Sequence, residues 1–517
     1  MRLETRKLLD KSFSGLGLFS LFIMGGALLV ILLPIFKRGS GAFLFQGTIE
    51  HRRFLMDKFE RGNRSSLDEE IVRVNSARRP IYRMLNQFEA EQGEKLNEVI
   101  RLCHELGMPD DAFGKKIKRR LKRLNKAEDF SDKFRILQDV SRRFETYEER
   151  SVDLGNKTKV IVKRVSQLEL SQESFSEVKE LVHDLLGPAP GAKSPVLVRK
   201  QYGQSRWERA QIKLHLLLNT EEWDYSDSSG MGKLFYTPRM DEFEGTALEP
   251  LFPYIEQKEK ELLEPRWTFY WGFLTDKSMD AHMFGGIMPE VLGTIYLTLG
   301  AILFAVPIGI ITAIYLTEYT QGGYIVSFLR SCISTLAGVP SIVFGLFGLA
   351  FFINTLHVSP SKSVLAGSLT LGLLILPMII RASEEAIKSV PQTYKSAALS
   401  LGAGKWHTVL TIVLPSALPG ILTGIVISMG RAAGETAPII FTAAVSVMGV
   451  LYNPIEALSH PTYALSWNIF NLSTEHEAVD EIRHVQFGMV MVLILIVLLF
   501  NLTAVILRAR ISKKLQR

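Results

Sequence analysis

Six long apolar stretches constrain this 517-residue chain more than any other feature of its sequence. A bilayer core of about 30 Å takes roughly 20 helical residues to cross, and each stretch reaches or nearly reaches that length with few or no charges. Only helices and closed barrels satisfy their backbone groups in lipid, and none of the stretches alternates with the period of two that a barrel strand requires. The stretches lie between residues 11 and 37, 290 and 318, 330 and 357, 362 and 381, about 415 and 438, and 484 and 508. We therefore expect an all-α polytopic membrane protein with six transmembrane helices.

The charges that flank these stretches predict how the chain is oriented. The cytoplasmic ends of membrane helices carry an excess of Lys and Arg. Such residues cluster before the first stretch and after the last: Arg2, Arg6, Lys7, Lys11, Arg508, Arg510, Lys513, Lys514 and Arg517. Both termini are therefore expected in the cytoplasm, and six spans place them on the same side. The segment between residues 381 and 407 then also lies inside, and the long segment after residue 37 lies outside.

The first apolar stretch is interpreted as an uncleaved anchor. It is about 24 residues long, whereas the apolar region of a signal peptide has 7–15 residues. A cleaved signal peptide is the alternative, because small residues follow at positions 39–42.

The chain is predicted to consist of three parts. Residues 1–36 hold the N-terminal tail and the first transmembrane helix, 37–266 form an extracytoplasmic insertion that is mainly helical at least to residue 186, and 267–517 form a five-helix core. In the insertion, apolar residues recur at spacings of three, four and seven, as on one face of an amphipathic helix: Leu67, Ile71, Val74, Ile81, Leu85 and Phe88. Pro80 falls within this pattern and is expected to bend or divide the helix.

A strongly basic cluster follows within the insertion. Eight of the twelve residues from Lys115 to Lys126 are Lys or Arg, and none is acidic. A solvated helix face explains the cluster most simply, and a surface that attracts anions or lipid headgroups is the alternative. Later in the insertion, residues 195–265 are mixed in character and could include strands.

The composition and motifs argue against several classes of function. The formal net charge of +7 is modest for this length, and we expect no nucleic-acid binding. The two cysteines, Cys103 and Cys332, fall in different parts of the chain and predict no disulfide. The ten histidines show no metal-ligand spacing, and the sequence has neither a P-loop nor a G-x-S-x-G motif. We therefore predict no metal, no cofactor and no catalytic residue, so that any ATP the protein uses is hydrolysed by another subunit.

The loop between the fourth and fifth stretches, residues 384–415, has the pattern of a docking element. Ala397, Ala398 and Leu401 share one helical face, Gly402 interrupts the pattern, and a second short apolar helix is expected from Trp406 to about residue 413. Two short helices around a glycine turn suit a groove on a partner protein, because small residues allow close approach. A plain connecting loop is the alternative.

This loop resembles the "EAA" coupling loop of ABC importer permeases, with the pattern E-A-A-x3-G-x9-I-x-L-P. The matching residues are Ser396, Ala397, Ala398, Gly402, Ile412, Leu414 and Pro415. Ser396 replaces the glutamate of the motif, which removes a charged contact to the ATPase. The resemblance implies that the loop sits in a cleft of an ATPase subunit and transmits the closure of that subunit to the spans.

Three further stretches resemble the phosphate-specific permease of the PstA family. They are GGIMPEVLGTIYLTL at 285–299, LAGVPSIVFGLFG at 336–348 and RAAGETAP at 431–438. The resemblance covers residues 267–517 and leaves about 45–265 without a counterpart. It implies a type I importer core in the inner membrane that is not itself an enzyme. It also implies four partners: a homologous second permease, a P-loop ATPase dimer, a periplasmic phosphate-binding protein and the lipid bilayer.

The RAAGETAP stretch supplies the candidate substrate pathway: Arg431, Glu435 and Thr436. Residues four apart share a helix face, and a charge in lipid costs about 3 kcal/mol, so Arg431 and Glu435 are expected to face the bundle interior. A guanidinium can grip phosphate oxygens as a fork. A carboxylate can accept a hydrogen bond from the P–OH of phosphate, which sulfate lacks. The alternative is that the two charges neutralise each other or pair with a neighbouring subunit.

The function predicted from these features is ATP-driven import of inorganic phosphate from a periplasmic binding protein to the cytoplasm. Two alternatives remain open. The chain could carry another oxyanion or solute, or it could be a phosphate-sensing receptor built on the permease fold, which the large insertion suggests. Arg330 and Arg381, near the ends of apolar stretches, are interpreted as interfacial anchors.

Overall fold

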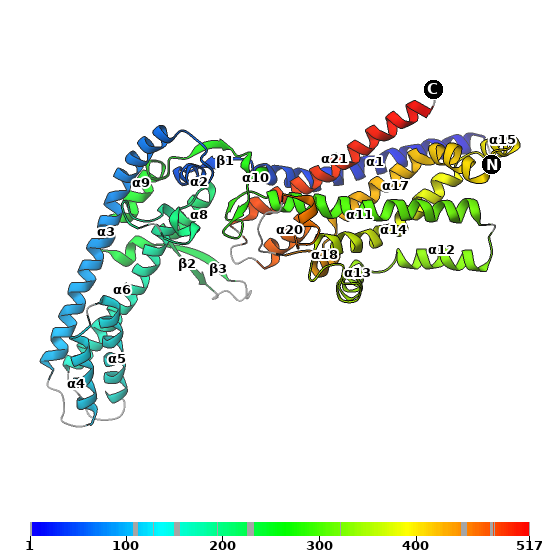
Figure 1. Ribbon diagram of the computed structural model, residues 1–517. Coiled ribbons are helices and arrows are strands. Elements are labelled where there is room, and N and C mark those ends of the chain that lie inside the picture. Colours follow the sequence, from blue (N-terminus) through cyan, green and yellow to red (C-terminus); the bar gives the residue numbers. More distant parts are fainter. Residues whose placement is uncertain are drawn as a thin grey trace. The chain divides into compact units, whose positions relative to one another are not determined.

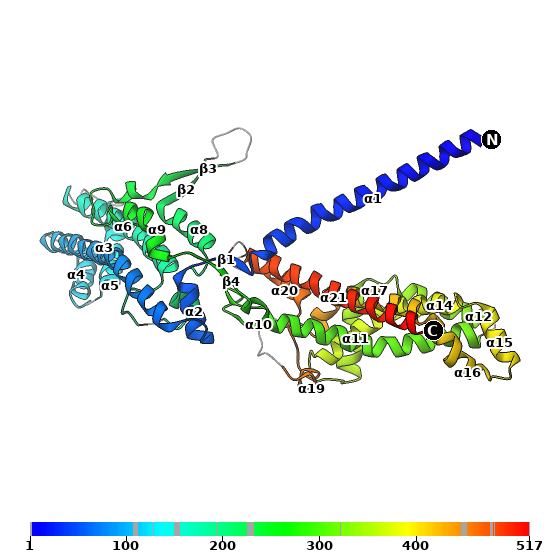
Figure 2. The same cartoon turned by 90° about the horizontal axis from the view of Figure 1, so that it is seen from above.

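The computed structural model divides the chain into two compact units. One combines Met1–Leu44 with Phe269–Arg517 and is named the membrane unit; the other, Phe45–Thr268, is named the insertion unit. The structure describes residues 3–106, 112–127, 129–148, 156–193, 195–224, 232–320, 322–445, 452–475, 479 and 481–515. The cytoplasmic location of both termini is predicted partly from Arg2 and Arg517, and these two residues lie outside the described ranges. Figure 1 and Figure 2 show the helices and strands of both units.

The membrane unit holds the long apolar helices. Within the described residues, five helices are long and apolar enough to cross a membrane, and a sixth span is present if a bent helix pair is one span. The five spans are Phe13–Ser40 in α1 (Leu3–Ser40), Met288–Tyr319 in α11 (Met288–Ile314) with the π-helical turn after it, Val364–Lys388 as α14, Lys405–Gly434 ending in α17 (Leu414–Gly434), and Arg483–Ile511 in α21 (Arg483–Leu515). The prediction of a polytopic α-helical membrane protein is confirmed.

The third apolar stretch is not one straight helix. α12 (Tyr324–Leu336) is followed by α13 (Ser341–Gly348), which continues as a π-helical turn to Thr355, and the pair is bent by 100°. Pro340 is the N-cap of α13, and the residue before a proline is pushed away from helical backbone angles. No residue of α12 is buried within this chain, so the helix lies on the outside of the unit.

Close packing of α11 against α14 forms the centre of the membrane unit (Figure 1). A Cβ atom added to Gly309 of α11 would lie 2.6 Å from Cγ2 of Ile379 on α14. One added to Gly372 of α14 would lie 2.6 Å from Cδ1 of Phe304 on α11. Small residues allow membrane helices to approach this closely. Short elements complete the unit: α10 (Gly272–Thr275), β5 (Ser278–Met279), β6 (Phe284–Gly285), α18 (Ala437–Thr442), α19 (Pro454–Ala457) and α20 (Leu465–Thr474).

The insertion unit is mainly helical, as the apolar periodicity predicts. Its helices are α2 (Ile49–Phe59), α3 (Arg64–Glu105), α4 (Ala112–Leu124), α5 (Phe130–Glu148), α6 (Asn156–Leu186), α7 (Val198–Gln201), α8 (Trp207–Leu218) and α9 (Leu251–Leu263). The segment after residue 195, which the sequence left open to strands, contains β2 (Asn219–Asp224) and β3 (Lys233–Pro238), paired as an antiparallel hairpin. A second two-stranded sheet pairs β1 (Leu44–Gly47) with β4 (Arg266–Phe269).

Pro80 does not divide α3, and that part of the prediction is wrong. The helix continues from Arg64 to Glu105 with Pro80 inside it. Buried side chains on both sides of the proline, Val74 before it and Ile81 and Leu85 after it, hold the helix against the core. Tertiary packing thus offsets the hydrogen bond that proline cannot donate.

Charged groups deep in the insertion unit tie several elements together. Arg78 is buried, and its guanidinium donates to Glu50 Oε1 at 2.6 Å and to the carbonyl oxygens of Leu186 at 2.8 Å and Leu262 at 2.7 Å. Burial, with the nearby Arg206 and Arg52 charges, lowers the pKa of His51 to about 3. The histidine is therefore neutral in the folded unit at physiological pH.

Candidate functional site

The structure pairs the two charges of the RAAGETAP stretch. Arg431 lies in the last turn of α17, and its Nε is 3.2 Å from Oε1 of Glu435. The helix ends at Gly434, however, and Glu435 is its C-cap with extended backbone angles. The expectation that both residues share one helix face is therefore wrong in detail. The two charges meet because the chain turns at the helix end.

The turn that carries Glu435 is fixed by neighbouring elements. The Glu435 carbonyl accepts a hydrogen bond of 3.0 Å from Ser466 Oγ on α20. Thr436 is half-buried and precedes α18, without making a side-chain cap. A Cβ atom added to Gly434 would meet no atom within 4 Å. Open space therefore lies beside the pair.

Arg431 also reaches toward α14. Its Nη1 is 3.3 Å from Sδ of Met378, and within the described residues its Nη2 makes no hydrogen bond. The Arg431 side chain is 38% exposed in this single chain. Part of the guanidinium thus remains able to donate hydrogen bonds to a ligand.

Two further arginines lie close together, one on α14 and the other on α12. Arg381, three residues after Met378, donates to Ser334 Oγ of α12. Arg330 of α12 has its Nε 3.5 Å from Glu384 Oε1, and its Nη2 donates to the Leu316 carbonyl at 2.9 Å. Both arginines are exposed in this single chain, and their role as interfacial anchors stays a prediction. No signal in the sequence pairs α12 with α14.

The two arginines line a cavity of about 350 Å³. Its other lining side chains are Ile333, Ile380, Glu384 and Glu385. Lys388 lies 3.4 Å from Glu385, one turn further along α14. Charged side chains therefore follow one another along α14. They begin with Arg381, one turn after Met378, and end with Lys388 at the end of the helix.

The predicted coupling residues surround a sharp turn. Ser396, Ala397 and Ala398 belong to α15 (Gln392–Ser400), and Gly402 ends it with a φ of 82°. The left-handed region favours glycine, which has no Cβ. Within this chain Ser396, Ala397 and Gly402 are exposed, Ala398 is buried, and Ile412, Leu414 and Pro415 are half-buried.

The second helix of the loop is not separate from the fifth span, contrary to the expectation. α16 (Lys405–Thr408), a π-helical turn at Val409–Val413 and α17 follow one another without a break. The π turn lies just before Pro415, which lacks the N–H that an α-helix needs. This part of the loop is thus continuous with the span that carries Arg431.

The loop combines a buried anchor with exposed apolar side chains. Lys395 Nζ is 2.5 Å from Glu318 Oε1, in the π-helical turn after α11. Leu401 is 89% exposed and Trp406 is 60% exposed. Exposed apolar groups held on an anchored loop suit a protein partner.

A buried polar cluster lies at the other end of α11 and has no counterpart among the predicted site residues. Glu290, in the first turn of α11, has its Oε1 2.7 Å from His282 Nε2 and 2.9 Å from Asn468 Nδ2. Asn468 belongs to α20 and is 178 residues away in sequence. No local spacing could have revealed this cluster. Among the described residues, no group of His, Cys, Asp and Glu could hold a metal ion.

The similarity to the following known proteins covers part of the chain. The family model "Binding-protein-dependent transport system inner membrane component" matches residues 305–517. The probable ABC transporter permease protein YqgI of Bacillus subtilis is 35% identical over 251 residues, which are 47% of this chain and 84% of that protein. The phosphate transport system permease protein PstA 1 of Mycobacterium tuberculosis is 34% identical over 250 residues, 46% of this chain and 78% of that one.

Solved structures add only a weak likeness. An inward-facing form of the MetNI methionine ABC transporter aligns with a TM-score of 0.34 and 18% identity, over 43% of this chain and 94% of that one. A likeness at this level supports no conclusion about this chain.

Proposed function

Because this chain belongs to the family of binding-protein-dependent transport system inner membrane components and is a PstA-like ABC transporter permease, we propose that it conducts inorganic phosphate. The family is one of transport permeases and not of enzymes. ATP hydrolysis is accordingly assigned to a separate ATPase dimer. The similarity to a phosphate transport system permease supports the choice of solute.

The observation that carries this proposal is the ion pair of Arg431 and Glu435 beside open space. The guanidinium uses its Nε for Glu435 and keeps Nη2 for an anion. Hydrogen phosphate accepts from Nη2 and, by displacing the contact to Met378 Sδ, from Nη1 as a fork; its hydroxyl donates to the carboxylate. Sulfate has no hydroxyl to donate to that carboxylate, and a site built to pair a hydroxyl discriminates strongly against a ligand that lacks one. Thr436 adds a hydroxyl next to the pair.

Arg381 and Arg330 extend this path toward the coupling loop. Arg381 follows Met378 by three residues, so the two occupy neighbouring positions on one helix face. An anion released by Arg431 would therefore meet a second cation about one helical turn away. Several moderate sites conduct better than one tight site, because the ion must also leave.

The remaining partners follow from the same proposal. The exposure of Arg431 in the single chain suits a path completed by a homologous second permease. Residues 391–414 would receive the movement of the ATPase dimer, and a periplasmic phosphate-binding protein would deliver the solute. The protein would lie in the inner membrane with both termini in the cytoplasm.

The experiment is uptake of labelled phosphate by the complete transporter in proteoliposomes, with binding protein outside and ATP inside. Unlabelled phosphate and arsenate, both protonated near neutral pH, should compete, and sulfate should not. Transport of sulfate or another solute in place of phosphate would assign the chain to a different substrate. A wild-type complex that moves no solute would favour the receptor alternative, which the insertion unit suggests because it lies outside the matched residues 305–517.

A further inference from the structure

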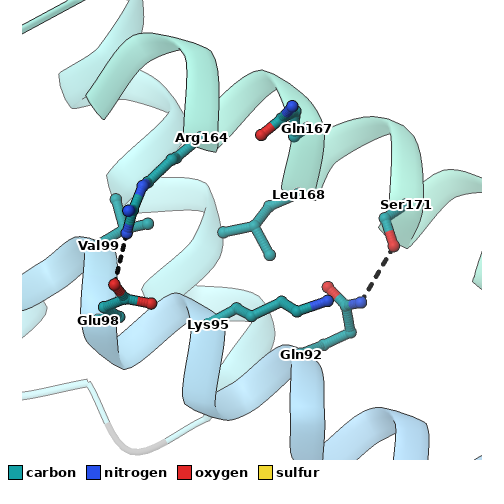
Figure 3. A pocket seen from close by; sticks show the side chains of 8 residues that line it. All are labelled: Gln92, Lys95, Glu98, Val99, Arg164, Gln167, Leu168 and Ser171. Atoms are coloured by element: carbon teal, nitrogen blue, oxygen red, sulfur yellow. Dashed lines mark hydrogen bonds and ion pairs between the residues drawn. The ribbon is translucent and has the colours of Figure 1, made fainter. Parts of the chain in front are cut away.

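A pocket of about 420 Å³ lies between α3 and α6 of the insertion unit. Figure 3 shows the side chains around it. Val99 of α3 and Leu168 of α6, both buried, form its apolar floor. The other lining groups are polar: Gln92, Lys95, Glu98, Arg164, Gln167 and Ser171. Its volume falls within the range of about 300–1,000 Å³ that is typical of small-molecule sites.

Two polar contacts between the helices close the ends of this pocket. Arg164 Nη1 lies 2.6 Å from Glu98 Oε1 at one end. Gln92 Nε2 donates to Ser171 Oγ at 3.0 Å at the other end. Both appear as dashed lines in Figure 3, with Leu168 between them. The hollow is therefore framed by side chains that are already held in place.

Gln92 leaves one atom without a partner. The residue is only 1% exposed, and its Oε1 is buried with no hydrogen bond within the described residues. Its Nε2 is committed to Ser171, which fixes the amide plane. Buried acceptors in native proteins are nearly always paired, so this oxygen calls for a donor from a molecule in the pocket.

Lys95 supplies a positive charge to the same space. Within the described part of the chain its ammonium makes no ion pair or hydrogen bond, and the same holds for the amide of Gln167. In Figure 3 the Lys95 side chain extends along the pocket toward Gln92. With Arg164 and Glu98 the lining carries two cations and one carboxylate. The site thus favours an anion.

We propose that this pocket binds a small oxyanion that carries its own hydroxyl, with hydrogen phosphate as the ligand. The oxyanion would accept hydrogen bonds from Lys95 and Gln167, and its hydroxyl would donate to Gln92 Oε1. Sulfate and simple carboxylates lack that donor at neutral pH. The ligand class follows from the pocket alone, and the choice of phosphate as its simplest member rests on the proposed function. The insertion unit would then bind the solute that the membrane unit moves.

Hydrogen exchange of the complete transporter tests this site locally. Peptides that cover residues 88–102 and 161–174 should exchange more slowly when phosphate is added at concentrations that saturate uptake, and sulfate should have no such effect. Lys95→Met should lose this protection, because it removes the free ammonium from an exposed position and leaves the fold unchanged. Gln92→Leu should lose it as well.

Two matched variants separate the site from general effects. Lys163→Met, on α6 but outside the pocket, should keep the protection. Arg431→Gln should keep it too, because that residue belongs to the membrane unit.

Three results would overturn the proposal: no slowing in the wild type, equal slowing by sulfate, or protection that persists in Lys95→Met. Uptake measured on the same preparations keeps the two proposals apart. Phosphate uptake without slowed exchange would overturn the proposed ligand site and leave the proposed function in place. Slowed exchange without phosphate uptake would support the ligand site and contradict the proposed function.

Discussion

The two units of this protein differ in the surroundings of their charged side chains. In the insertion unit, ion pairs occur in the core, as between Arg78 and Glu50, and at the surface. The surface pair Arg164–Glu98 has side chains 42% and 59% exposed and contributes little. In the membrane unit a charge within a span is costly. Among the described residues, Arg431 pairs with Glu435, Arg330 with Glu384, and Glu318 with Lys395 of the coupling loop. In the membrane unit, the presence of a charge is by itself a signal of function. In the insertion unit, the signal is a buried polar atom without a hydrogen-bond partner, such as Gln92 Oε1.

The largest effect is expected from Arg431. Arg431→Gln should lower phosphate uptake at least about tenfold, because a lost hydrogen bond to a charged group costs about 1.5–3 kcal/mol and each 1.4 kcal/mol is about a factor of ten. Arg431→Lys keeps the charge but not the two-nitrogen fork, and its uptake should lie between those of the wild type and Arg431→Gln. Uptake of labelled phosphate in proteoliposomes measures both. Wild-type uptake in Arg431→Gln would show that a membrane-unit charge can be structural only.

The next effect concerns the turn of the coupling loop. Gly402→Ala forces a side chain into left-handed backbone, at a cost of roughly 1–2 kcal/mol. It should reduce ATP hydrolysis stimulated by the binding protein several-fold. Gly404→Ala is the matched control, since Gly404 has a φ of −67° and open space around it. Equal activities of the two variants would contradict a role for this turn.

The insertion unit is expected to lose stability in acid through His51. The unfolded histidine titrates near 6.5 and the folded one near 3, so the unfolded state binds the extra proton between these values. Stability should fall as the pH drops below 6.5, by about 2 kcal/mol at pH 5. Urea unfolding at pH 7 and pH 5, followed by tryptophan fluorescence, should show a smaller pH effect in His51→Gln. An identical pH effect in both proteins would exclude His51 as its source.

The smallest effect is expected from Ser396. Ser396→Glu restores the glutamate of the coupling motif at an exposed position, where a new ion pair is worth about 0.2–1 kcal/mol. The ATPase subunit should bind up to about fivefold more tightly in a titration. Ser400→Glu, one turn further along α15, should not change the affinity. Weaker binding of Ser396→Glu would contradict the predicted contact.

The sequence predicts the membrane unit better than it predicts the contacts inside it. Apolar length identifies the spans, and the spacing from Ser396 to Pro415 identifies the loop, because both signals are local. The bend at Pro340 and the unbroken helical run into α17 depend on how neighbouring turns satisfy their hydrogen bonds. Pairs such as Arg330–Glu384 and Gln92–Ser171 join segments 54 and 79 residues apart, and only packing brings them together.

Glu435→Gln tests the central claim most directly, because it keeps the size of the side chain and removes only the carboxylate that would accept the phosphate hydroxyl. The complete transporter, with its binding protein unchanged, should import labelled phosphate much more slowly while its subunits assemble normally. Import at the wild-type rate by an intact Glu435→Gln complex would contradict the account.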